Sequence, residues 1–170
     1  MEDANTNYIK YLIELSQKGR KNSFIELCNF NLLNVYALSL RIVASKALAK
    51  EMTKVIFSAA WENIVHFREE IPFPDWLKAI SVYTILEEIR SKKIFSELNV
   101  DVAEDRPESK YLLDQMIFNL PEKERIIFVL HELEGYSPQE ISDFLGDMSK
   151  TSVVEVLKSV RSTFIEELNR

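Results

Sequence analysis

The chain has 170 residues, of which 46% are hydrophobic and 28% are charged, and its net charge at pH 7 is −6. It contains 3 glycines, too few for the loops of nucleotide-binding enzymes or for β-rich turn networks, so the composition predicts an all-α protein. The polar, acidic N-terminus and the lack of an apolar run of roughly 18 residues argue against a signal peptide and a membrane span. A single cysteine, Cys28, excludes an internal disulfide, and we expect a cytoplasmic protein.

Helical segments are predicted throughout the first half of the chain. Apolar residues recur at helical spacing in residues 8–15, 24–42, 48–64 and 76–93. Gly19 separates the first two segments, and Ser23 is the expected N-cap of the second. "IPFPDW" (71–76), with two prolines, breaks the pattern before the last segment. The expected inward side chains of the first two segments are Tyr8, Tyr11, Leu12, Leu15, Phe24, Leu27, Cys28, Phe30, Leu32, Val35, Leu38 and Ile42.

A polar segment, residues 99–111, follows this helical block. "NVDVAEDRPESKY" contains a proline, four acidic residues and few large apolar side chains, which indicates a solvated linker. We therefore expect two helical domains, residues 1–98 and residues 112–170, joined by this acidic linker.

The second half of the chain carries clear helix boundaries. Pro121 suits a first helical turn, and Gly135 is expected to end that helix. "SPQE" (137–140) is a capping box with proline at the first helical position, and Gly146 is expected to end the helix that it begins. A final helix has the expected apolar stripe Val153, Val156, Leu157, Val160, Phe164 and Leu168. Three helices with two tight turns predict a helix-turn-helix domain.

The charge of the chain is uneven. Residues 1–99 hold 13 basic and 12 acidic residues, whereas residues 113–170 hold 6 basic and 11 acidic residues. The half with the predicted helix-turn-helix is thus the acidic half, which is the wrong sign for nonspecific binding to phosphates.

Four stretches, in order and with the linker in place, resemble the extracytoplasmic-function (ECF) sigma factors of bacterial RNA polymerase along nearly the whole chain. They are "LIELSQKGRKNSFIELCNFNLLNVYALSLRIV" (12–43), "VIFSAAWENIVHF" (55–67), "FPDWLKAISVYTILEEIR" (73–90) and "LPEKERIIFVLHELEGYSPQEISDFLG" (120–146). The resemblance implies a transcription initiation factor that binds core RNA polymerase and the −10 and −35 promoter elements. It also implies an anti-sigma factor as a further partner.

The resemblance assigns roles to particular residues. It implies a polymerase-binding site at Glu51, Lys54 and Val55. It implies −10 contacts from Trp76, Lys78, Tyr83 and Arg90, with Lys92 and Lys93 extending the basic end of that helix. It implies −35 contacts from Ser149, Lys150, Ser152, Lys158 and Arg161.

Three stretches depart from the usual pattern of the family. In the −10 helix, Val82 and Tyr83 stand where the family typically has Arg and Asn. The polymerase-binding stretch "LAKEMTKV" (48–55) keeps one acid, Glu51, where the family has several, and adds Lys50 and Lys54. In the last helix, "MSKTSVVEVLKSVR" (148–161), valines and a serine replace three basic residues and Glu155 adds an acid. Fewer phosphate contacts predict weak DNA affinity for this helix alone, since each contact contributes about 0.9 to the salt slope.

A second hypothesis follows from these departures: a sigma-like protein that binds a protein partner, such as an anti-sigma factor, with little affinity for DNA. A continuous acidic or apolar face on the last helix would favour a protein partner, and a basic stripe would favour DNA. Val153, Val154 and Val156 cannot all face the core, which hints at an apolar exposed strip. We expect no enzyme activity, cofactor or metal site, because "HELEG" (131–135) lacks the second histidine of a zinc motif.

Overall fold

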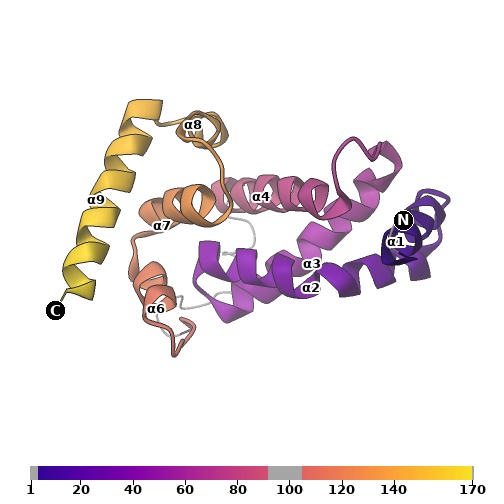
Figure 1. Ribbon diagram of the computed structural model, residues 1–170, viewed down its shortest axis with the longest axis horizontal. Coiled ribbons are helices and arrows are strands. Elements are labelled where there is room, and N and C mark those ends of the chain that lie inside the picture. The colour runs from indigo at the N-terminus through magenta and orange to yellow at the C-terminus, as the bar shows by residue number, and fades with distance from the viewer. Residues whose placement is uncertain (1–3, 92–104, 170) are drawn as a thin grey trace. The chain divides into compact units, whose positions relative to one another are not determined.

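The computed structural model describes residues 4–91 and 105–169 (Figure 1). Every regular element in these residues is a helix, and they contain no strand, which confirms the predicted all-α class. The chain divides into two compact units. Unit 1 comprises the described residues of 1–39 and 49–97, and unit 2 those of 40–48 and 98–170. None of the described helices is both long and apolar enough to cross a membrane.

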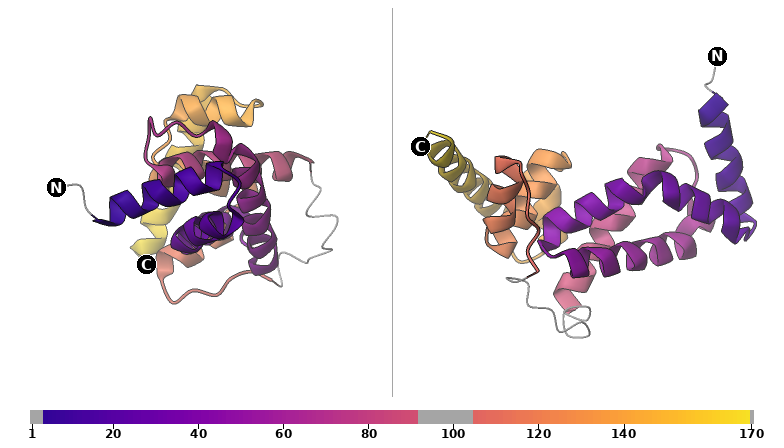
Figure 2. Two further views of the ribbon diagram at one scale, coloured as in Figure 1. Left: turned by 90° about the vertical axis from the view of Figure 1, so that its right-hand side faces the viewer. Right: turned by 90° about the horizontal axis from the view of Figure 1, so that it is seen from below.

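Unit 1 is a helical bundle whose elements follow the chain in order. They are α1 (Ala4–Gln17), most of α2 (Lys21–Val43), most of α3 (Lys46–Asn63), the short 3-10 helix η1 (Ile64–His66) and α4 (Phe73–Ser91). Figure 2 shows α2 and α3 running side by side and α1 crossing them steeply. Buried core side chains include Leu12, Ile13, Phe24, Leu27, Val35, Leu38, Met52, Ile56, Ala60, Ile64, Leu77, Val82 and Ile85.

Several local predictions for unit 1 are wrong. Ser23 is not the N-cap of α2. The helix already begins at Lys21, so Ser23 lies inside it and is buried. Four of the expected inward side chains are exposed instead: Tyr8, Tyr11, Phe30 and Leu32. Spacing alone placed them on the core stripe, but the faces of α1 and α2 that meet other helices are narrower than that stripe.

An aromatic cluster fixes the segment between α3 and α4. The ring of Phe67 lies 5.7 Å from that of Phe73 and 5.2 Å from that of Trp76, measured between ring centroids. The side-chain amide of Gln17 donates hydrogen bonds to the carbonyl oxygens of Ile64 (3.1 Å) and Phe67 (2.8 Å). The irregular segment is thereby held against α1, and the start of α4, with Trp76 in its first turn, is anchored.

Unit 2 contains the predicted helix-turn-helix. Its helices are α6 (Leu112–Asn119), α7 (Glu122–Phe128), a π-helical turn η2 (Val129–Leu133), α8 (Pro138–Leu145) and α9 (Lys150–Leu168). Helix α9 packs against α7 and α8 through Val153, Leu157, Val160 and Phe164, all of which are buried. Leu168 was expected in this stripe but is exposed, because α9 extends past the helices that cover it.

The turns of unit 2 follow the sequence signals closely. The Ser137 hydroxyl accepts a hydrogen bond from the Glu140 N–H, and the Glu140 carboxylate accepts one from the Ser137 N–H. These bonds to Ser137 also lower the pKa of Glu140. Gly146 closes α8 with a φ of 73°, which glycine adopts without strain. The predicted capping box and C-terminal glycine are therefore confirmed.

Two charged residues hold the turn between α2 and α3, which belongs to unit 2. Arg125 is 5% exposed, and its guanidinium donates to the carbonyl oxygens of Ile42 (2.8 Å) and Leu120 (2.7 Å). Burial lowers the pKa of Arg125. Asp105 accepts from the Ser45 hydroxyl (2.5 Å) and the Ala47 N–H (2.8 Å), and these bonds lower its pKa. A cation thus meets the end of α2 and an anion meets the start of α3, as the helix dipoles favour.

Candidate nucleic-acid interface

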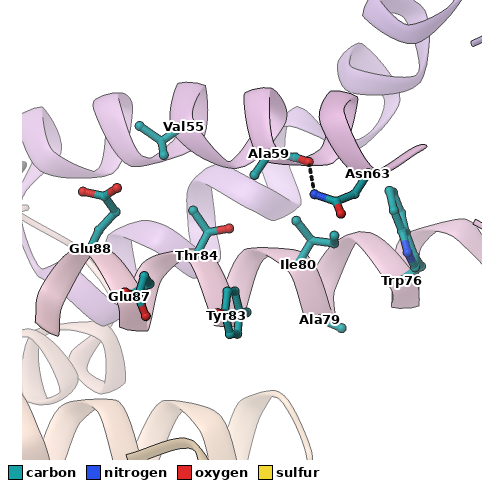
Figure 3. A pocket seen from close by; sticks show the side chains of 10 residues that line it. All are labelled: Val55, Ala59, Asn63, Trp76, Ala79, Ile80, Tyr83, Thr84, Glu87 and Glu88. Atoms are coloured by element: carbon teal, nitrogen blue, oxygen red, sulfur yellow. Dashed lines mark hydrogen bonds between the residues drawn. The ribbon is translucent and has the colours of Figure 1, made fainter. Parts of the chain in front are cut away.

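A groove of about 500 Å³ lies between α3 and α4 in unit 1. The two helices run antiparallel along it, so Val55 lies opposite Glu88 at one end and Asn63 lies opposite Trp76 at the other (Figure 3). Its apolar walls are formed by Val55, Ala59, Trp76, Ala79, Ile80 and Tyr83. The two alanines leave the space that the larger side chains border.

Three of the four residues predicted for the −10 element share one face of α4. Trp76, Tyr83 and Arg90 are spaced by seven residues, which places them on the same side of a helix. Tyr83 is 70% exposed, whereas Trp76 is half-buried against Phe67. Lys78 lies about half a turn away on the other side of α4, so the structure does not place it with the other three.

The residues predicted for polymerase binding form one patch on α3. Glu51 lies one helical turn before Lys54 and Val55. The Lys54 ammonium is 2.6 Å from the Glu51 carboxylate. Val55 also lines the groove that Trp76 and Tyr83 border. The groove therefore joins residues from two predicted sites, a proximity that the sequence did not indicate.

The end of the groove opposite Trp76 is acidic. Glu87 and Glu88 both line it. The Glu87 carboxylate is 3.0 Å from the Arg90 guanidinium, whereas Glu88 makes no ion pair with any residue that the structure describes. Lys92 and Lys93 lie outside the described residues. The described part of this end carries more negative than positive charge.

In α9, three of the five residues predicted for the −35 element make contacts within unit 2. Ser149 caps the helix by accepting from the Ser152 N–H, and the two hydroxyls lie 2.9 Å apart. The Arg161 guanidinium binds the Glu132 carboxylate of η2 at 2.5 Å. Lys150 and Lys158 are exposed, and the described residues offer neither of them an ion pair.

The outward face of α9 is neither a basic stripe nor an acidic one. Opposite the buried stripe, the exposed residues are Thr151, Glu155, Lys158, Ser162 and Glu166, whose charges alternate in sign. The expected exposed valine strip is only partly present, since Val153 is buried and both Val154 and Val156 are half-buried.

A second hollow in unit 1 was not expected from the sequence. It has a volume of about 430 Å³ and lies between α1 and residues 67–74, with Lys10, Glu69 and Glu70 at its rim. Glu69 adopts a φ of 57°, a conformation uncommon for a residue other than glycine. Among the described residues, no group of three His, Cys, Asp or Glu side chains is placed to hold a metal ion.

Comparisons with known proteins agree with this geometry. Residues 110–153 match the family model "Sigma-70, region 4", which covers α6, α7 and α8 and the first turn of α9. The ECF RNA polymerase sigma factor SigW of Bacillus subtilis is 27% identical over 159 residues, covering 81% of this chain and 85% of SigW. The ECF RNA polymerase sigma-E factor of Haemophilus influenzae is 29% identical over 155 residues, covering 79% and 82%. The chain is thus similar to ECF sigma factors over most of its length.

Solved structures share the fold. CnrH, solved with the cytosolic domain of CnrY, aligns with a TM-score of 0.55 at 20% identity, covering 95% of this chain and 97% of that chain. The sigma factor RpoE of Bartonella quintana, solved with the anti-sigma factor NepR, aligns with a TM-score of 0.57 at 15% identity, covering 86% and 96%. At these identities the two likenesses show a shared helical fold.

The region-four match ends at Val153, in the first turn of α9. The remainder of α9 carries Lys158 and Arg161, which were predicted to contact the −35 element, and Glu155, which adds an acid. The match therefore includes the helices that position α9 and leaves most of α9 itself outside it.

Proposed function

We propose that this chain initiates transcription by binding core RNA polymerase through α3 and promoter DNA through α4 and α9. The observation that carries the proposal is the order of its parts: a helical unit with an exposed aromatic residue, Tyr83, on α4, followed by a region-four helix-turn-helix. The protein has no catalytic step of its own in this proposal, since polymerase performs the chemistry. It acts in the cytoplasm, where polymerase and promoter DNA are found.

Polymerase binding is assigned to the patch formed by Glu51, Lys54 and Val55. Val55 is half-buried at the mouth of the groove and offers an apolar contact. Glu51 and Lys54 already pair with each other, so their net charge is zero. Docking through this patch therefore depends more on apolar contact than on the acidic surface usual in the family.

Contact with the −10 element is assigned to the face of α4 that carries Trp76, Tyr83 and Arg90. Lys78, predicted for the same role, lies on the other side of that helix. An exposed aromatic ring supports stacking on an unpaired base, which is worth roughly 1–3 kcal/mol per base. Tyr83 is suited to this role because most of its side chain is exposed, whereas Trp76 serves partly as an anchor of the aromatic cluster.

Contact with the −35 element is assigned to the start of α9. Ser149, Lys150 and Ser152 surround the helix N-terminus, where backbone N–H groups and the helix dipole favour a phosphate. Lys158 adds one exposed cation, and Arg161 contributes if the ion pair with Glu132 opens. With so few cations, we expect α9 to bind promoter DNA only when polymerase holds it there.

Co-elution of the purified protein with core RNA polymerase on size exclusion tests the proposal. We expect a stable complex at micromolar concentration, and Val55→Glu should abolish it by placing a charge at the apolar patch. Ser58→Glu is the matched control, because Ser58 is exposed on the same helix but does not line the groove. No complex with the wild-type protein would overturn the proposal.

A second candidate function is binding of a protein partner, such as an anti-sigma factor, with little use of DNA. Two observations favour it: the alternating charges on α9 and the solved relative RpoE, which is bound to an anti-sigma factor. Lys150→Glu combined with Lys158→Glu separates the candidates. Loss of promoter-specific transcription supports DNA contact, and unchanged transcription supports the protein-partner function of α9.

A further inference from the structure

The outer face of α2 is apolar and carries no charge. Four large apolar side chains are exposed on it: Ile25, Phe30, Leu32 and Leu33. Leu33 is the most exposed of them, at 80%. Residues 27–40 include no charged side chain, and the exposed polar residues among them, Asn29 and Asn34, are neutral. A helix normally turns charged residues toward water, so this face is suited to contact with another apolar surface.

Helix α1 extends this apolar surface. The Tyr8 hydroxyl donates a hydrogen bond to the Glu26 carboxylate (2.7 Å), which holds the tyrosine beside α2. Tyr11 follows Tyr8 by about one turn, and both rings are exposed. Together with the outer face of α2, these side chains expose roughly 650 Å², because a fully exposed side chain of this size has about 200 Å² of surface. Each partner in a standard interface buries about 800 Å², so the exposed surface is close to what a stable dimer needs.

The outer face of α2 is complementary in size to a copy of itself. Phe30, Leu33 and Ala37 follow one another at spacings of three and four residues, as along the seam of a coiled coil. If two copies of α2 cross antiparallel at Leu33, Phe30 of one copy meets Ala37 of the other. The small Ala37 leaves room for the Phe30 ring, as a hole receives a knob. A twofold interface requires this kind of match, since each surface contacts its own copy.

The lack of charge favours a second copy as the occupant. A phosphate backbone would find no cation on α2 between Glu26 and Arg41. A charged protein surface would lose water from its own charged groups without meeting a counterpart. A second copy of the same face brings no charge to the contact, so it carries neither penalty.

We propose that the outer face of α2, flanked by Tyr8 and Tyr11, is a dimer interface between two copies of this chain. The two α2 helices cross antiparallel, with Leu33 of each copy at the twofold axis and Phe30 of each copy over Ala37 of the other. The proposal is independent of the proposed function, because it uses none of the residues assigned to polymerase or to DNA.

Sedimentation velocity of the full-length protein tests the dimer. Between about 1 and about 200 µM, we expect the measured mass to rise from 19.8 kDa toward twice that value. Leu33→Glu places two carboxylates at the axis and should keep the protein monomeric throughout. Leu168→Glu, the same change at an exposed leucine of α9, is the matched control and should leave the rise unchanged. Phe30→Ala should weaken the dimer at least about tenfold, as expected for a central aromatic contact.

A crosslink tests the position of the twofold axis. In a Cys28→Ser background, Leu33→Cys should give a disulfide-linked dimer under mild oxidation, because residues at the axis lie within reach of each other. Leu168→Cys in the same background should remain monomeric.

A monomer at every concentration, with the helical circular dichroism intact, would overturn the proposal, and the outer face of α2 would then belong to a different partner. So would a dimer that Leu33→Glu leaves intact or that Leu168→Glu also disrupts. A dimer that forms in solution but gives no crosslink through Leu33→Cys would overturn the antiparallel arrangement.

Discussion

The two helices expected to meet DNA, α4 and α9, differ in what their side chains already contact. On α4, Tyr83 is 70% exposed beside a groove. On α9, Ser149 caps the helix by accepting from the Ser152 N–H, and Arg161 binds Glu132. Residues of the right type at the right spacing therefore do not suffice to predict a contact surface. Unit 1 presents an apolar, aromatic surface, whereas unit 2 presents a helix of balanced charge.

The largest expected effect concerns the scaffold of α9. Arg125→Met keeps the bulk of the side chain but leaves the carbonyl oxygens of Ile42 and Leu120 without their donor. We expect unit 2 to lose about 3 kcal/mol of stability, measured by amide exchange in α7 and α9. Arg125→Lys, which can serve one carbonyl, should lose less. Equal protection in all three proteins would contradict this role of Arg125.

Removal of the exposed ring on α4 is expected to have the next largest effect. Tyr83→Ala should lower promoter-specific transcription with core polymerase between about fivefold and about 100-fold, as expected for the loss of one base-stacking contact. Tyr83→Phe keeps the ring and should stay near wild type. A Tyr83→Ala protein with full activity would remove the distinction between α4 and α9.

A charge change on α9 should strengthen its contact with DNA and so make it more like α4 in this respect. Glu155→Lys replaces an anion at the centre of the exposed face with a cation, so promoter affinity of the holoenzyme should rise several-fold and the salt slope should steepen by about 1. Glu108→Lys makes the same change of net charge outside α9 and serves as the control. An identical response from both variants would show that only net charge matters.

The ion pair between Arg161 and Glu132 offers a smaller and more specific comparison. Both groups are partly exposed, so either Arg161→Ala or Glu132→Ala should cost less than about 1 kcal/mol of stability. If Arg161 also contacts DNA, Glu132→Ala should raise promoter affinity and Arg161→Ala should lower it. Unchanged affinity in both variants would confine Arg161 to the ion pair.

Asp105 gives a dependence on pH. Hydrogen bonds from Ser45 and Ala47 hold its folded-state pKa below the usual carboxyl value, so its contribution to stability is present at neutral pH and is lost as pH falls through that lowered pKa. Asp105→Asn should therefore destabilise unit 2 at pH 7 and have little effect in strong acid. Denaturant titrations of both proteins at several pH values measure the difference.

Local signals in the second half of the sequence predicted the turns of unit 2 well, whereas the expected cap at Ser23 was wrong. The capping box at Ser137 and the left-handed Gly146 depend on residues within one turn, and both are present. Contacts between distant residues were not predictable: Arg125 reaches Ile42 across 83 positions, and no periodicity indicates that bond. The short helix α6 was missed because it lies in the apolar stretch between the linker and Pro121, where no cap marks its start.

The candidate site was predicted only in part for the same reason. Helical spacing places Trp76 and Tyr83 on one face of α4, but it cannot show that Val55 of α3 borders the same groove. The spacing also could not show that Arg161 is held by Glu132, since the two residues are 29 positions apart. Patterns fix the face of a helix, and tertiary packing decides what that face meets.

The most direct measurement is run-off transcription from a library of genomic fragments with core RNA polymerase from the same bacterium. We predict transcripts with discrete 5′ ends that require this protein and that weaken with Tyr83→Ala. Transcripts absent from every fragment, while the protein remains folded, would contradict its role as a transcription initiation factor.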